Sequence, residues 1–120
     1  MVEVVCHLRD FDGFFRGRVE LMLAEEHPVL PAHDHERIAV ERDYRHDDLN
    51  RAREALMAHR RGFVALFTGL AAEQWARIGV HPEMGSISVL DAATQLVLHD
   101  IDHTEQITRC LGLAERLPVE

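Results

Sequence analysis

Lysine is absent from this chain of 120 residues, so all 13 basic side chains are arginines. The arginines are interleaved with 21 acidic residues, and the net charge is -8 at pH 7. Proteins that bind nucleic acid rely on clustered Lys and Arg to replace the counterions of the phosphate backbone. The charge pattern therefore argues against nucleic acid as a partner.

Aromatic residues, glycine and proline are also scarce. Aromatics make up 6% of the chain, and 7 glycines and 4 prolines are too few for the many tight turns of a β-sandwich or barrel. Hydrophobic residues make up 47%, which argues against disorder. Because alanine, leucine, glutamate and arginine dominate, we predict one all-α domain over residues 1–120.

Long hydrophobic runs and cysteine motifs are missing as well. No window approaches the roughly 20 apolar residues that span a bilayer, so we expect no membrane as a partner. The N-terminal sequence MVEVVCHLRDF lacks the basic start and apolar run of a signal peptide. Cys6 and Cys110 form no CxxC pair and are typical of reduced thiols. These features predict a cytoplasmic protein.

Apolar residues recur with the period of a helix in three stretches, which are residues 2–24, 47–69 and 89–111. Asp47 is the N-cap candidate for the second helix, and Asp48 is well placed against the positive end of the helix dipole. Ser88 with Asp91 forms a variant capping box for the third helix, and Gly112 is its expected terminator.

The connections between these helices differ in character. Residues 25–46 are rich in charge and proline and predict a long crossing loop with one helical turn around residues 36–40. A loop of this length is unusual unless it covers a site or an interface. Residues 71–77 predict a short extra turn, and residues 79–88 a turn-rich connector.

His99 and His103 lie four residues apart on the last predicted helix. This spacing places both imidazoles on one face, as in helical metal clamps. The sequence HDIDH lacks the glutamate of the HExxH motif, and a solvated or hydrogen-bonded pair has the same spacing. His7, on the apolar side of the first helix, is the best candidate for a third ligand; the alternative is a hydrogen-bonded core histidine. We expect the remaining loop and connector histidines to lie on the surface, namely His27, His33, His35, His46 and His81.

Three segments carry a resemblance to a known family. CHLRDF surrounds His7, HPEMGSISVLD precedes the last helix, and HDIDHTEQI surrounds His99 and His103. Over nearly its whole length the chain resembles the DinB-like superfamily, including YfiT-like metal-dependent hydrolases of the bacterial cytosol. The resemblance implies an up-down helical bundle of the DinB/YfiT-like four-helix type, with three long helices and a long crossing loop in this chain.

The resemblance also implies a metal site. By position, the ligands of the divalent metal are His7, His99 and His103, and Gln106 matches the family pattern HxxxHxxQI. Three imidazoles leave a coordination position free for water or substrate, and Zn²⁺ and Ni²⁺ are the expected metals. Asp102 could hold a ligand imidazole by a hydrogen bond, the alternative being a solvated acid, and Gln106 could bond a ligand imidazole or a substrate. No catalytic residue is assigned.

One part of the family pattern is missing, because no counterpart of the family's first helix precedes His7. Either the start lies upstream, or a second copy of the chain completes the bundle. A three-helix unit would expose part of an apolar stripe, and stripes of this size mark interfaces. We therefore expect a homodimer.

Two chemistries are consistent with such a site. A metal-activated water would hydrolyse a substrate, or a low-molecular-weight thiol would be transferred, and the resemblance implies both because relatives include thiol-dependent transferases. The alternative is a non-catalytic or degenerate metal-binding module that acts through its dimer interface. Arg60 interrupts the apolar stripe of the second helix and could pair with Asp10 or Asp100, or bind an anionic substrate.

Overall fold

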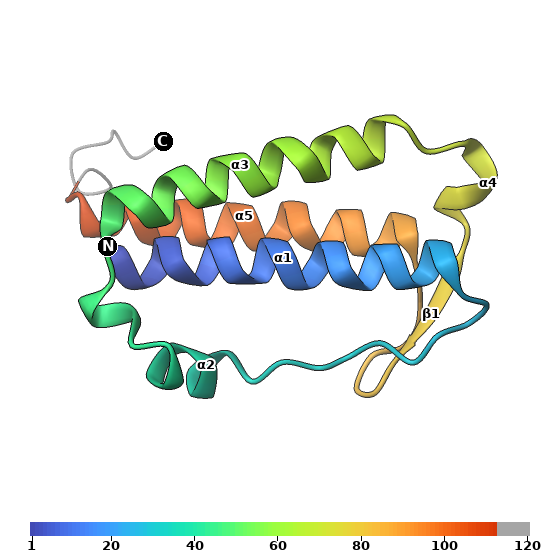
Figure 1. Ribbon diagram of the computed structural model, residues 1–120, viewed down its shortest axis with the longest axis horizontal. Coiled ribbons are helices and arrows are strands. Elements are labelled where there is room, and N and C mark those ends of the chain that lie inside the picture. The colour runs from blue at the N-terminus through green and yellow to red at the C-terminus, as the bar shows by residue number, and fades with distance from the viewer. Residues whose placement is uncertain (113–120) are drawn as a thin grey trace, which may run out of the picture.

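The computed structural model describes residues 1–112, which fold into helices and one β-hairpin (Figure 1). The elements in chain order are α1 (Val2–Ala24), α2 (His35–Glu41), the 3₁₀ helix η1 (Tyr44–His46), α3 (Leu49–Thr68), α4 (Ala72–Trp75), β1 (Ile78–His81), β2 (Gly85–Ser88) and α5 (Val89–Cys110). The predicted bundle of three long helices with a long crossing loop is confirmed. The prediction of a single domain over residues 1–120 extends beyond the described residues and stays a prediction.

Helix α1 packs against both α3 and α5. Figure 1 shows that α1 and α3 run in the same direction, whereas α5 runs opposite to them. The first two long helices are parallel because the crossing segment, residues 25–48, carries the chain back along α1 before α3 begins. No helix among residues 1–112 has both the length and the apolar character that crossing a membrane requires.

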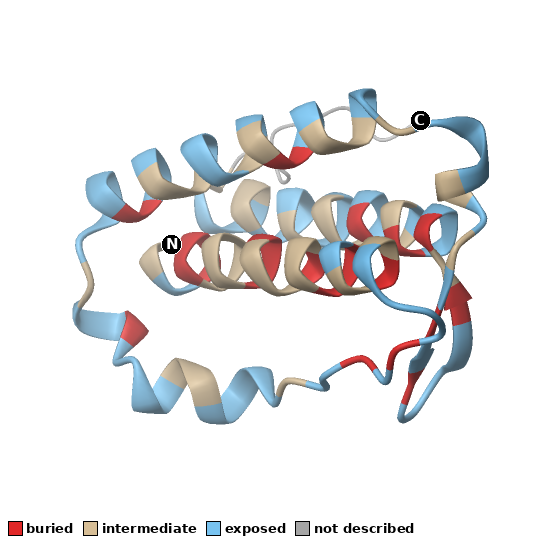
Figure 2. Ribbon diagram, turned by 45° about the vertical axis from the view of Figure 1, so that its right-hand side comes forward, coloured by how far each residue is buried: buried red, intermediate tan, exposed pale blue. Residues whose placement is uncertain are grey.

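The core lies along the buried side of α1 (Figure 2). Four of its side chains, Phe11, Phe15, Val19 and Met22, belong to one cluster of buried residues. Phe63 of α3 and Leu96 of α5 belong to the same cluster. Full burial of a side chain of this size stabilises a fold by about 1.5–3 kcal/mol, so this cluster contributes to holding α1 against α3 and α5.

The helix ends follow the predicted capping residues, with one shift. Ser88 and Asp91 form the capping box of α5, and Gly112 after its end has a φ of 69°. The N-cap of α3 is Asp48, which accepts a hydrogen bond from the backbone N–H of Arg51. The predicted N-cap, Asp47, was therefore wrong by one residue, and its side chain instead accepts a hydrogen bond from Arg9.

The predicted turn-rich connector is a β-hairpin. Strands β1 and β2 pair antiparallel, with His81 opposite Gly85, and a three-residue loop joins them. Gly85 has a φ of 75°, the left-handed conformation that a three-residue hairpin loop requires. The crossing segment adds to this hairpin, because the N–H of Leu30 donates to the carbonyl of Val80 at 2.8 Å.

Candidate metal centre

Three histidines converge at one place between α1 and α5. One ring nitrogen each of His7, His99 and His103 lies within 4.8 Å of the others. The Nε2 atoms of His7 and His99 are 2.9 Å apart, although the two residues are 92 positions apart in the sequence. The antiparallel packing of α1 and α5 brings the early histidine opposite the HxxxH pair. The structure therefore brings the three predicted ligand residues together, while their binding of a metal stays a prediction.

The ring environment favours neutral imidazoles. Burial, together with the nearby His103 and His99, lowers the pKa of His7 from 6.5 to about 4. Burial and the nearby His103 likewise lower the pKa of His99 to about 4. Both rings are therefore neutral at pH 7, the form whose nitrogen lone pair can bind a metal.

Gln106 orients the third imidazole. Its Oε1 lies 2.8 Å from Nδ1 of His103, and because a carbonyl oxygen only accepts, Nδ1 carries the proton. The lone pair of His103 is then on Nε2, the tautomer that a metal ligand with a hydrogen-bonded second nitrogen adopts. Asp102 is exposed, and within residues 1–112 no hydrogen bond joins it to a histidine of the cluster.

The donor set fits a divalent transition metal. Nitrogens bound to one tetrahedral zinc ion at the usual bond length are about 3.3 Å apart. The separations here run from 2.9 Å to less than 4.8 Å, so adjustments of about an ångström within the side chains would suffice. Imidazole is a ligand that zinc and nickel both accept.

A pocket of about 750 Å³ opens beside the cluster. The aromatic side chains of Phe11 and Phe15 line its apolar part, between the histidines and Arg18. Tyr44, Ala39 and His35 contribute to the lining from the crossing segment. A pocket of this volume is in the range of small-molecule sites.

Sequence reasoning placed several histidines of the crossing segment and hairpin on the surface, and this was wrong for two of them. His33 is half-buried and its ring stacks on Phe14 with centroids 3.8 Å apart. His81 is 6% exposed, and its Nδ1 accepts hydrogen bonds from the backbone of the hairpin loop. His35 is exposed as expected, but it also lines the pocket, with its ring centroid 5.9 Å from that of His7. The unusual length of the crossing segment was the sequence signal that its residues could cover a site.

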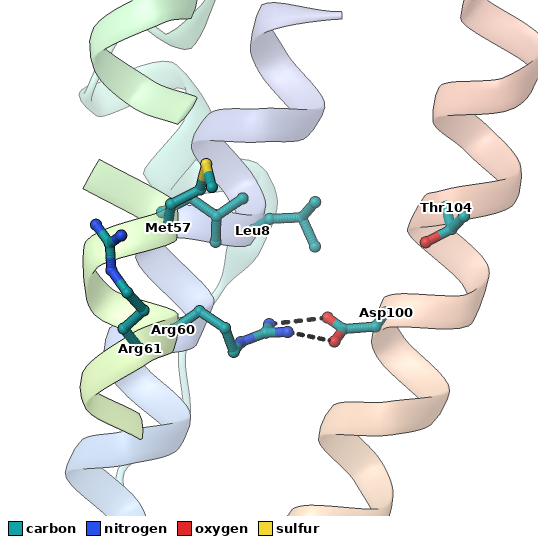
Figure 3. A pocket seen from close by; sticks show the side chains of 7 residues that line it. Leu8, Met57, Arg60, Arg61, Asp100 and Thr104 are labelled. Carbon is teal, nitrogen blue, oxygen red and sulfur yellow. Dashed lines mark hydrogen bonds and ion pairs between the residues drawn. The ribbon is translucent and has the colours of Figure 1, made fainter. Parts of the chain in front are cut away.

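Arg60 connects the three long helices. It donates to both carboxylate oxygens of Asp100 on α5, at 2.6 and 3.0 Å, and to Asp12 on α1 at 2.8 Å. Figure 3 shows it extending from α3 across to Asp100. The pairing with Asp100 was one of the alternatives that the sequence left open. The alternative partner Asp10 instead binds Arg9 and Tyr44.

The Arg60–Asp100 pair spans a second groove, which has a volume of about 390 Å³ (Figure 3). Leu8, Leu56 and Met57 form its apolar lining, and Thr104 lies on the α5 side. Because the N–H groups of its guanidinium bind two carboxylates, Arg60 forms structural ion pairs here.

Comparisons with known proteins show which family and which solved fold this chain resembles. A family model, the DinB superfamily, matches residues 1–107. A solved structure that superposes with a TM-score of 0.80 is described as YfiT from Bacillus subtilis, a probable metal-dependent hydrolase with an unusual four-helix bundle topology. The two sequences are 26% identical, and the match covers 92% of this chain and 65% of that one. No curated protein sequence matches this chain.

Proposed function

Because this chain belongs to the DinB superfamily, we propose that it is a metal-dependent enzyme acting on a small molecule. The observation that carries the proposal is the convergence of three histidine nitrogens beside a pocket of about 750 Å³. The description of YfiT as a probable metal-dependent hydrolase supports hydrolysis as the reaction class.

The proposed ligands are His7, His99 and His103, and the proposed metal is Zn²⁺ or Ni²⁺. A bound zinc ion of this type lowers the pKa of a coordinated water to about 7, which supplies a nucleophile at neutral pH. Gln106 holds the tautomer and orientation of His103. Phe11 and Phe15 exclude water from the neighbouring part of the pocket and thereby strengthen polar contacts with a substrate.

Metal content is the direct test of the site. The chain purified after expression with added zinc or nickel should hold one equivalent of metal by elemental analysis. His7→Ala and His103→Ala should each lose it and remain helical by circular dichroism. His59→Ala, on an exposed position of α3, is the matched control and should keep it. Full retention of metal by His7→Ala would exclude the three-ligand site.

The reaction type can be separated by one comparison. Hydrolysis needs only water, whereas transfer needs a low-molecular-weight thiol as second substrate. Ester and alkyl-halide model substrates should therefore be incubated with the metal-loaded chain, with and without added thiol. Turnover without thiol supports a hydrolase, and turnover that requires thiol supports a transferase.

A non-catalytic metal module is the alternative. A structural zinc site is normally closed by four protein ligands, whereas three converge here within the described residues. If the metal were structural, a chelator would lower the melting temperature by many degrees. A small shift supports the enzyme, and absence of metal in every preparation would indicate a degenerate relative.

We further propose that the chain forms a homodimer through the sides of α3 and α5 that flank the groove spanned by Arg60. Met57 and Val64 on α3 are exposed and lie seven residues apart, on one side of that helix. Val97 and Ile101 on α5 are exposed at a four-residue step. Exposed apolar side chains at these helical spacings favour burial against another chain, and a second copy is the occupant we propose.

A further inference from the structure

The large pocket has one cationic side chain among its lining residues, Arg18. Arg18 follows His7 by eleven residues on α1, about three helical turns, so both residues lie on the same side of the helix. The rise between their backbones is about 16 Å, and a helical side chain leans back toward the N-terminus, which for Arg18 is the direction of His7. Phe11 and Phe15 line the pocket between them.

Arg18 is unusual among the arginines of residues 1–112, because it is buried and has no carboxylate partner. Its side chain is 7% exposed. Nε donates to the backbone carbonyl of Pro31 at 3.0 Å, and the guanidinium carbon lies 5.5 Å from the centroid of the Phe15 ring. These two contacts fix the side chain in place. They leave both terminal amino groups without a hydrogen-bond partner in the described part of the chain.

This arrangement contrasts with that of two partly buried arginines, which do have carboxylate partners. Arg9 and Arg60 each bind two carboxylates. A buried charge without a partner is costly, and burial lowers the pKa of Arg18 accordingly. The guanidinium nevertheless keeps its proton at neutral pH. An anionic ligand in the pocket would supply the missing partner.

We propose that Arg18 binds the carboxylate of an elongated substrate whose opposite end reaches the three histidines. The apolar middle of this substrate lies over Phe11 and Phe15. This inference rests on the proposed function for the role of the histidine end, but the carboxylate contact itself requires no metal. The substrate class is an organic acid with an apolar body.

A carboxylate fits better than a phosphate. Two free amino groups on one planar guanidinium match the two oxygens of a carboxylate. A phosphate dianion calls for more positive charge, and among residues 1–112 Arg18 is the single arginine in the lining. Glu3 and Glu36 also line the pocket, but both are exposed, so water and salt screen their repulsion of an anion.

The test compares three probes with the same apolar chain: octanoate, 1-octanol and octylammonium. Binding to the metal-stripped full chain is measured by calorimetry at neutral pH. The wild-type chain should bind octanoate on the order of tenfold more tightly than octanol, as one charge-assisted contact predicts. Equal binding of octanoate and octanol, or preferred binding of octylammonium, would overturn the proposal without any variant.

Variants then assign the preference to one residue. Arg18→Gln should bind octanoate and octanol equally, and Arg18→Lys should keep part of the preference because it keeps the charge. Arg16→Gln on the same helix removes an equal charge from a site paired with Glu20 and should leave the preference unchanged. An undiminished preference in a folded Arg18→Gln would refute the assignment. If Arg18→Gln does not fold, the proposal is tested by the octanoate preference of Arg18→Lys and by the three probes with the wild-type chain.

The result of the octanoate test can be distinguished from the result of the metal-content test. His103→Ala should lose metal and still prefer octanoate over octanol. Metal binding by the wild-type chain without an octanoate preference would refute this inference alone. An octanoate preference in a chain that never binds metal would refute the proposed function and leave the anion contact in place.

Discussion

Asp12 is a buried carboxylate in the middle of the bundle, with 1% of its side chain exposed. Its Oδ1 accepts from Arg60, whereas its Oδ2 has no hydrogen-bond partner within residues 1–112. Arg60 also holds Asp100, so one guanidinium ties three helices together. The buried charge of Asp12 is therefore compensated by one side chain, that of Arg60.

Replacement of Arg60 should test this dependence. We expect Arg60→Met to lower the free energy of unfolding by about 3 kcal/mol, because it leaves Asp12 buried without a partner. Asp100→Asn should cost less, because Asp100 is 32% exposed and Asp12 keeps its partner. Urea denaturation measures both values, and equal losses in the two variants would contradict the explanation.

The two cysteines should differ in reactivity. Cys6 is fully buried, donates to Asp47, and burial raises the pKa of its thiol to about 11. Cys110 is exposed. Because the thiolate is the reactive form, a chromogenic disulfide reagent should modify one thiol rapidly in the native chain and the second only on unfolding. Cys110→Ser should abolish the rapid phase, and two rapid equivalents in the wild type would disprove the assignment.

At the scale of elements, the crossing segment is fastened to α1 through Asp10. Tyr44 of η1 donates a hydrogen bond to this carboxylate, and Arg42 lies 3.0 Å from the same oxygen. Burial raises the pKa of Asp10, but hydrogen bonds from Arg9 and Tyr44 outweigh it and hold the pKa below its usual value. The ionised form is therefore favoured in the folded state.

The depressed pKa of Asp10 makes the free energy of unfolding decrease as the pH falls in the acid range. A carboxyl group with a depressed folded pKa stabilises the fold above its unfolded pKa of about 4, and the contribution is lost as the pH falls through the folded value. Asp10→Asn should be less stable than the wild type at pH 7, and the gap should narrow below about pH 4. Urea denaturation at a series of pH values measures this difference in the free energy of unfolding. Glu54→Gln, at an exposed position of α3, controls for net charge, and a constant gap for Asp10→Asn would argue against the role of Asp10.

Some elements were predictable from the sequence and others were not. The long helices carry their own signals, namely a helical period and capping residues such as Ser88 and Gly112. The juxtaposition of His7 with the HxxxH pair followed from the apolar side of one helix and the family resemblance.

The hairpin and the buried His81 depend on contacts that the local sequence does not encode. Strands of four residues have too few positions to show a period, and β1 is completed by Leu30 from the distant crossing segment. Arg18 was missed for the same reason. Its burial depends on the crossing segment, where the Pro31 carbonyl receives its Nε–H.

For the whole molecule, the testable quantity is the oligomeric state. We expect light scattering after size-exclusion chromatography to give the mass of two chains at micromolar concentration. Val97→Glu should shift the mass to one chain, because a charge would be buried in the apolar interface. Val40→Glu on α2, where the side chain is 80% exposed, is the matched control. A wild-type chain that is monomeric at these concentrations would rule out the homodimer.

The distance in sequence between His7 and His99 has a consequence for biosynthesis. Chains leave the ribosome from the N-terminus, so α1 is outside long before α5 has been made. Within the described residues the histidine cluster needs both helices, 92 positions apart. Until α5 has been made, a nascent chain therefore has one of the three imidazoles outside the ribosome. Metal loading at this cluster would thus mark a chain in which α5 has docked against α1.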